Sequence, residues 1–207
     1  MKFNTLILIL FFLVQCKNDK PDVLKDQVFP LLVIVSYPYL IEQCAITSAS
    51  YTGPIAPITS GFGTAGMNQL AVTKYQNPRA ASRSVCVYSP QGLQTKTPTL
   101  FLFHGFGSPS AEPYMSLIQF LVSKGYVVVF PLYFSDTTTT AAENYAIMKA
   151  GAEYAVAQST SIIDTTKVGY LGHSYGGGAV PYLAYEGLVN NKWGTSSSFL
   201  FTMAPFY

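Results

Sequence analysis

Residues 172–176 have the sequence Gly-His-Ser-Tyr-Gly, and this G-x-S-x-G pattern admits few local structures. It directly follows the short apolar run 167–171 and opens a stretch of helical character, so it predicts a sharp turn from a strand into a helix. Such a turn pushes the serine hydroxyl into the open. Gly172 and Gly176 are required because side chains on either side of Ser174 would collide with neighbouring backbone. The pattern therefore predicts Ser174 as a nucleophile at the end of a buried strand.

The rest of the chain from about residue 69 alternates between expected strands and helices. Continuous apolar runs such as 99–103 are typical of strands buried on both faces, and Thr140 with Glu143 forms a capping box that opens a helix. Pro181 is expected to interrupt the helix after the turn. This alternation predicts an α/β protein with a mostly parallel sheet and helices on both faces. The expected strands are 84–88, 99–103, 126–130, 167–171 and 199–203, and the expected helices are 111–124, 140–158 and 175–189.

A second motif, His104-Gly105-Phe106-Gly107, lies at the carboxyl end of the expected strand 99–103. Ligand sites in parallel sheets lie beyond this end of the strands. Acyl transfer passes through an oxyanion, which preorganised backbone N–H groups stabilise. The N–H of Tyr175, after the serine, and the N–H of Phe106 are the expected donors.

The segments 104–107 (HGFG), 172–178 (GHSYGGG) and the strand that ends in Ala204-Pro205 resemble the α/β-hydrolase fold. Within it they are most similar to the group of dienelactone hydrolases, chlorophyllases and cutinase-like polyester hydrolases. The resemblance covers residues 69–207. It implies a carboxylic-ester hydrolase with Ser174 as nucleophile, an oxyanion hole at Phe106 and Tyr175, and a small-molecule or polymeric ester as substrate.

The triad of this fold runs serine, then acid, then histidine along the chain. After Ser174 the sequence contains one acid, Glu186, and no histidine, and its other histidines are His104 and His173. His104 is expected to shape the oxyanion loop and His173 to turn away from the serine. Two explanations stay open. The chain is a partial α/β-hydrolase domain whose C-terminal strands and helices are missing, or it is a non-catalytic surface lipoprotein that binds through a hydrolase scaffold.

The N-terminus has the character of an export signal. Lys2 precedes the apolar run 5–14, which is too short to cross a bilayer. Residues 13–16 then resemble the lipobox of bacterial lipoproteins, in which Cys16 would be lipidated. We therefore expect a signal peptide at 1–16 and a tether with an irregular segment at 17–68. A lipid-free secreted protein and an uncleaved anchor are the alternatives.

Two further cysteines, Cys44 and Cys86, are expected either to pair in an oxidising compartment or to remain buried free thiols. Tyr133 and Phe134, which follow the expected strand 126–130, are placed either to stack on an apolar acyl or aryl group or to pack in the core.

Composition excludes several classes of function. Hydrophobic residues make up 49% of the 207 residues and charged residues 11%, which excludes a disordered chain. The net charge of +2 comes without a basic cluster, so no nucleic-acid partner is expected. The G-x-G-x-x-G pattern at 61–66 lacks a preceding strand and a following acid, so it is not a dinucleotide site. We expect no metal and no cofactor, and contact with a membrane only through the lipid anchor. The oligomeric state stays open.

Overall fold

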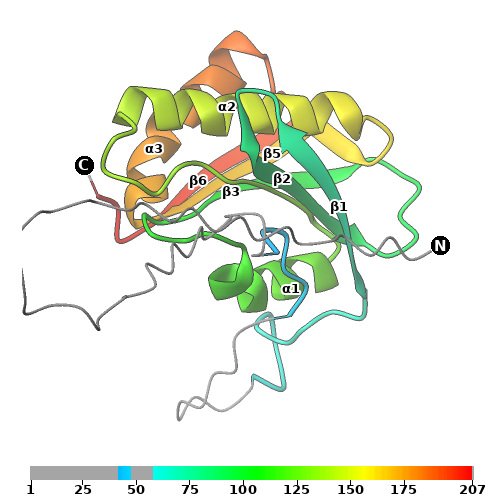
Figure 1. Ribbon diagram of the computed structural model, residues 1–207. Coiled ribbons are helices and arrows are strands. Elements are labelled where there is room, and N and C mark those ends of the chain that lie inside the picture. The colour runs from blue at the N-terminus through cyan, green and yellow to red at the C-terminus, as the bar shows by residue number, and fades with distance from the viewer. Residues whose placement is uncertain (1–41, 48–57, 207) are drawn as a thin grey trace, which may run out of the picture. The chain divides into compact units, whose positions relative to one another are not determined.

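The computed structural model describes residues 42–47 and 58–206, which build one six-stranded sheet with the strand order β1-β2-β4-β3-β5-β6 (Figure 1). The strands are β1 (Leu70–Asn77), β2 (Ala80–Pro90), β3 (Thr97–Phe103), β4 (Val127–Pro131), β5 (Ile163–His173) and β6 (Ser197–Met203). The helices are η2 (Glu112–Tyr114), α1 (Met115–Ser123), α2 (Ala141–Gln158), α3 (Ser174–Tyr185) and the π-helical turn η3 (Glu186–Asn190).

Four neighbouring strands of the sheet are parallel. β4, β3, β5 and β6 pair in parallel, whereas β1 pairs antiparallel with β2 and β2 antiparallel with β4. The predicted fold class is thereby confirmed. The antiparallel hairpin was not predicted beyond the central part of β2, because its first strand mixes polar and apolar residues without strict alternation.

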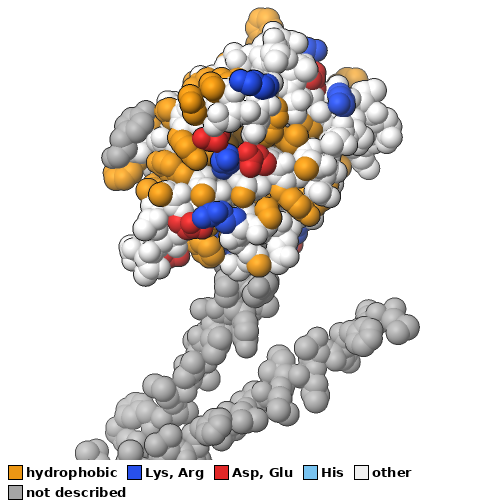
Figure 2. Space-filling view, turned by 90° about the horizontal axis from the view of Figure 1, so that it is seen from above, with side chains coloured by type: hydrophobic (Ala, Val, Ile, Leu, Met, Phe, Trp, Pro, Cys, Tyr) orange, Lys and Arg blue, Asp and Glu red, His pale blue; other side chains and the backbone are white. Residues whose placement is uncertain are grey.

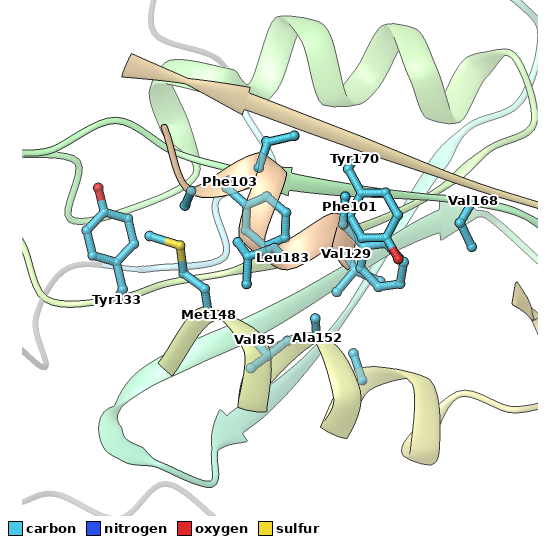
Figure 3. Packing of buried hydrophobic residues seen from close by; sticks show 14 of the residues in the cluster. Val85, Phe101, Phe103, Val129, Tyr133, Met148, Ala152, Val168, Tyr170 and Leu183 are labelled. Carbon is cyan, nitrogen blue, oxygen red and sulfur yellow. The ribbon is translucent and has the colours of Figure 1, made fainter. Parts of the chain in front are cut away.

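Helices cover the sheet on both faces, with α1 on one side and α2 and α3 on the other (Figure 1). Along β3, Leu100 and Leu102 pack into the core under α1, and Phe101 and Phe103 into the core under α2 and α3. Figure 3 shows the second of these cores, in which Phe101 and Phe103 lie among residues from the helices and neighbouring strands. Burial on both faces is the reason that this strand is a continuous apolar run.

The capping box predicted at the start of α2 is only half formed, and the proline in α3 does not end that helix. The Thr140 hydroxyl accepts the Glu143 N–H at the start of α2 (3.2 Å), as the capping box requires, but the Glu143 carboxylate pairs with Arg79 instead of completing the box. The helix after the turn begins at Ser174 and contains Pro181 in its interior. The expectation that Pro181 interrupts this helix is therefore wrong, since one missing N–H is tolerated where the flanking turns are packed on the sheet.

Cys44 and Cys86 are joined by a disulfide that holds the short segment 42–47 against β2. Hydrogen bonds reinforce this attachment, because the Gln43 side-chain oxygen accepts the Ser84 N–H (2.7 Å) and Tyr88 donates its hydroxyl to the Ala45 carbonyl (2.9 Å). A cross-link between residues 42 positions apart in the chain restricts the unfolded state. Its expected contribution is about 2–4 kcal/mol of unfolding free energy.

The expected signal peptide, the lipidation site Cys16 and most of the expected tether lie outside the described residues. Within the part of the chain that is described, no helix is both long and apolar enough to cross a membrane. The segment 61–66 forms a turn that the Thr64 N–H closes onto the Gly61 carbonyl (3.1 Å), and a strand rather than a helix follows it.

Charges are dispersed over the surface. On the face seen in Figure 2, basic side chains lie beside acidic ones. Arg79 pairs with Glu143 at 2.8 Å, and Lys149 with Glu186 at 3.2 Å. The basic side chains in these pairs are therefore neutralised locally.

Candidate active site

The turn between β5 and α3 presents Ser174 as the sequence pattern predicts. Ser174 has φ 51°, a left-handed conformation that is unfavourable for a residue with a Cβ atom. Its side chain is partly exposed, whereas the strand residues Tyr170 and Leu171 are buried. Strain at a single residue between two well-packed elements is typical of functional positions.

The glycines of the turn are required by close backbone approaches. A Cβ atom on Gly176 would lie 2.4 Å from the carbonyl oxygens of both Phe103 and His104, at the end of β3. A Cβ atom on Gly172 would lie 2.4 Å from the Gly176 carbonyl oxygen. The first turn of α3 therefore sits directly on the loop that carries the second motif.

That loop comes within contact distance of the serine. A Cβ atom on Gly105 would lie 3.2 Å from the Ser174 Cβ and 2.9 Å from the His173 Nδ1, so the loop and the turn approach each other closely at this glycine. The ring of Phe106 lies 6.2 Å from the ring of Tyr175, between ring centroids. The structure thus brings the two residues expected to form the oxyanion hole together beside Ser174.

His104 is a buried, uncharged residue that shapes this loop. Its side chain is 0% exposed, and its ring stacks on that of Tyr133 at 4.0 Å. Nδ1–H donates to the Gly105 carbonyl (2.8 Å), and Nε2 accepts the Tyr133 N–H (3.4 Å). Burial lowers the pKa of His104 from 6.5 to about 4, against the opposing effect of the bond to Gly105. Both ring nitrogens are used internally, so His104 is not available to the serine.

The depressed pKa of His104 predicts a loss of stability in mild acid. The unfolded chain binds a proton at His104 below pH 6.5, whereas the folded protein does so only near pH 4. The contribution of neutral His104 to the unfolding free energy is therefore fully present above pH 6.5. It is lost as the pH falls toward 4, by about 3 kcal/mol in total. Urea unfolding at several pH values measures this loss. The His104→Gln variant cannot take up this proton, so its unfolding free energy should fall by about 3 kcal/mol less than that of the wild type between pH 7 and pH 4. An equal fall in both proteins would contradict the assignment.

His173, exposed at the end of β5, is also engaged away from the serine. Its Nδ1 lies 2.9 Å from the hydroxyl of Tyr114, and this hydroxyl in turn accepts the Gly105 N–H at 2.6 Å. Tyr114 was not identified from the sequence, because an aromatic residue in a short helix carries no local signal for a contact 59 positions away. Glu186 lies in η3 and pairs with Lys149, so it is not a partner of a histidine here.

The aromatic residues after β4 contribute to the core rather than to a pocket rim. Tyr133 is only 1% exposed and donates its hydroxyl to the His104 carbonyl at 3.2 Å. Phe134 is half-buried, with the Arg83 guanidinium 4.5 Å from its ring centre. Two exposed aromatic residues lie near Ser174 instead. Phe106 is 51% exposed and its ring lies near that of Tyr175, and Phe206 is 65% exposed and donates its N–H to the Ser174 carbonyl (3.0 Å).

A strand-to-helix turn with an exposed serine, set on a mostly parallel sheet beside a glycine loop, defines the α/β-hydrolase class of protein. Residues 59–195 match the family model of chlorophyllase. The chain belongs to the chlorophyllase family.

Three similar solved structures are esterases. The chain is similar to esterase B from Lactobacillus rhamnosis (TM-score 0.55, 16% identity, 67% of this chain and 49% of that one). It is also similar to a fungal esterase from Rhizomucor miehei (TM-score 0.54, 14% identity, 69% of this chain and 45% of that one). A third is carboxyl esterase 2 from Tuber melanosporum (TM-score 0.52, 16% identity, 77% of this chain and 48% of that one). The chain therefore spans about half the length of these esterases, and identities this low establish the fold alone. A search of curated proteins gave no significant match.

Proposed function

We propose that this chain acts in carboxylic-ester hydrolysis with Ser174 as the nucleophile. The observation that carries the proposal is the left-handed φ of 51° at Ser174, which holds a partly exposed hydroxyl directly beside the Gly105 loop. Membership of the chlorophyllase family and the esterase neighbours support this class of reaction.

In the proposed reaction, the Ser174 Oγ attacks the carbonyl carbon of the ester. The carbonyl electron pair moves to the oxygen, and the N–H groups of Phe106 and Tyr175 stabilise the resulting oxyanion. Collapse of this intermediate breaks the ester C–O bond and releases the alcohol, which leaves an acyl group on Ser174. Water then releases the acid and restores the serine. The residues present supply attack and oxyanion stabilisation.

The hydroxyl proton requires a base, and among residues 42–47 and 58–206 no hydrogen bond joins a histidine to the Ser174 hydroxyl. In this fold the base follows the nucleophile in the chain. We therefore propose that the complete active site includes residues beyond those described here.

The alternative is a non-catalytic surface protein that binds a ligand through this scaffold. The engagement of His104 and His173 in internal hydrogen bonds favours it, since a serine without a base is a weak nucleophile. For either function we propose export, with a lipid anchor at Cys16. The disulfide between Cys44 and Cys86 supports export, because such bonds persist in oxidising compartments. As substrate we propose a small-molecule or polymeric ester with an apolar part that contacts the exposed ring of Phe106.

Covalent labelling distinguishes the two functions. A p-nitrophenyl alkylphosphonate ester reacts with an activated serine, forming an Oγ–P bond and releasing p-nitrophenolate. The protein is expressed both as these 207 residues and with the sequence that follows Tyr207 in its natural gene. We expect one adduct, which mass spectrometry maps to Ser174. The Ser174→Ala variant should not form it, whereas the control Ser196→Ala, at an exposed serine, should. Labelling of neither protein would reject the hydrolase and favour the binding protein.

A further inference from the structure

The hydroxyl of Tyr114 connects the two backbone segments that flank the candidate nucleophile. It accepts the Gly105 N–H at 2.6 Å and lies 2.9 Å from the His173 Nδ1. A phenol has a single proton, so the bond to Gly105 uses the oxygen as acceptor and leaves the proton for His173. One side chain therefore joins the loop after β3 to the residue immediately before Ser174.

This arrangement determines which amide of the loop remains free. The Gly105 N–H is occupied by Tyr114, whereas none of the hydrogen bonds within the described segments uses the N–H of Phe106. The first N–H groups of a helix, such as that of Tyr175 in α3, also lack partners within the helix. Within the described segments, the N–H groups of Phe106 and Tyr175 are therefore available to donate to an oxyanion.

The position of Tyr114 is itself fixed from several sides. Its ring packs against that of Phe130, with 5.5 Å between centroids, and the following residue, Met115, is fully buried. At the start of η2, the Ala111 N–H donates to the Gln43 carbonyl (2.9 Å), next to the disulfide at Cys44. Burial raises the pKa of the Tyr114 hydroxyl above its ordinary value of 10.0, so the proton needed for the bond to His173 is retained at neutral pH.

We infer that Tyr114 is a positioning residue for the oxyanion hole, in which its hydroxyl sets the distance between the Phe106 loop and the Ser174 turn. The inference rests on the proposed function. Gly105 contributes to the same arrangement, because a Cβ atom there would lie 3.3 Å from the Tyr114 hydroxyl oxygen and 2.9 Å from the His173 Nδ1 and would crowd both groups. In this inference Tyr114 acts through its bonds to the loop and to His173.

The Tyr114→Phe variant tests the inference, since it removes one oxygen and keeps the ring. Amide hydrogen exchange measured by NMR should become about tenfold faster at Gly105, the size expected for one lost hydrogen bond. With the p-nitrophenyl alkylphosphonate ester as probe, the maximal rate of labelling of Ser174 should fall about a hundredfold, as for a small displacement of catalytic groups. The probe concentration at half-maximal rate should stay unchanged. Tyr154→Phe, a half-buried tyrosine of α2 whose ring packs on Tyr75, is the matched control and should alter neither quantity.

Variants of His173 examine the other end of the connection. His173→Gln keeps an acceptor for the Tyr114 proton and should retain most of the labelling rate, whereas His173→Leu should lower it as Tyr114→Phe does. A Tyr114→Phe protein that labels at the wild-type rate would overturn the inference, as would unchanged exchange at Gly105. If neither the 207-residue protein nor its longer form is labelled, the proposed function fails, and exchange at Gly105 still decides whether Tyr114 holds the loop.

Discussion

Replacing Ser174 with glycine is expected to abolish ester turnover and at the same time to make the protein more stable. Loss of the nucleophile from a complete serine triad lowers kcat on the order of a millionfold. The stability gain has a separate cause, namely the left-handed φ of 51° at Ser174. For a residue with a Cβ atom this conformation is unfavourable by roughly 1–2 kcal/mol. Glycine avoids that strain, but it destabilises the folded state by about 0.5–1 kcal/mol because the unfolded chain becomes more flexible. We expect a net gain of about 0.5–1 kcal/mol in unfolding free energy.

Ser174→Ala is the matched control for this experiment. Alanine removes the hydroxyl but keeps the Cβ atom, so it should abolish turnover without stabilising the fold. Turnover of a p-nitrophenyl ester is measured with the longer form of the protein proposed to hold the complete active site. Urea unfolding compares the wild type, Ser174→Gly and Ser174→Ala. Turnover retained by Ser174→Ala would remove Ser174 as the nucleophile. Equal stability of the glycine and alanine variants would show that the turn is not strained.

The parts of this fold that were predicted are those encoded by neighbouring residues. The turn at 172–176 was located because its glycines are separated from the serine by fixed spacings, and α2 because Thr140 lies three positions before Glu143. The interior strand β3 was evident from its apolar run at 100–103, since a strand buried on both faces is mostly apolar.

The parts that were missed depend on contacts between distant residues. The antiparallel pairing of β1 with β2 is set by register and by an irregularity at Gln76–Asn77, neither of which has a sequence pattern. The start of α1 was placed too early, because Pro113 lies in the short helix η2 that precedes it. Tyr114 reaches His173 only through the assembled sheet, so its role was invisible in the sequence.

The two edge strands of the described sheet differ in chemistry. β1 carries Lys74 and an irregular register near its end, features that discourage pairing with another chain. β6 contains no charge and no proline, and it exposes Phe199, Leu200 and Phe201 by 48%, 49% and 55%. Apolar residues exposed on both faces of a strand are characteristic of a strand that further structure covers. This matches the expectation that the α/β-hydrolase domain is partial.

The second large effect is expected at Gly176, where the sheet and the candidate site meet. Gly176→Ala places a Cβ atom 2.4 Å from the carbonyl oxygens of Phe103 and His104. These are backbone atoms at the end of a central strand, so they cannot rotate away as a side chain would. Relief requires α3 and β3 to separate, and we expect a loss of about 3 kcal/mol in unfolding free energy, at the upper end for overpacking. Urea unfolding measures this loss, and Gly178→Ala, at a half-buried position in the same helix, is the control.

The control should be as stable as the wild type or more so, because alanine favours a helix by about 1 kcal/mol over glycine. Gly176→Ala should also slow the reaction at Ser174, because separating α3 from β3 moves the Tyr175 N–H away from the Phe106 N–H. Labelling of the folded fraction at Ser174 should therefore slow by about a hundredfold, as for other small displacements of catalytic groups. A Gly176→Ala protein with wild-type stability and wild-type labelling would show that the contact between turn and strand is not needed. The position of the Tyr175 N–H would then not depend on the close packing of α3 against β3.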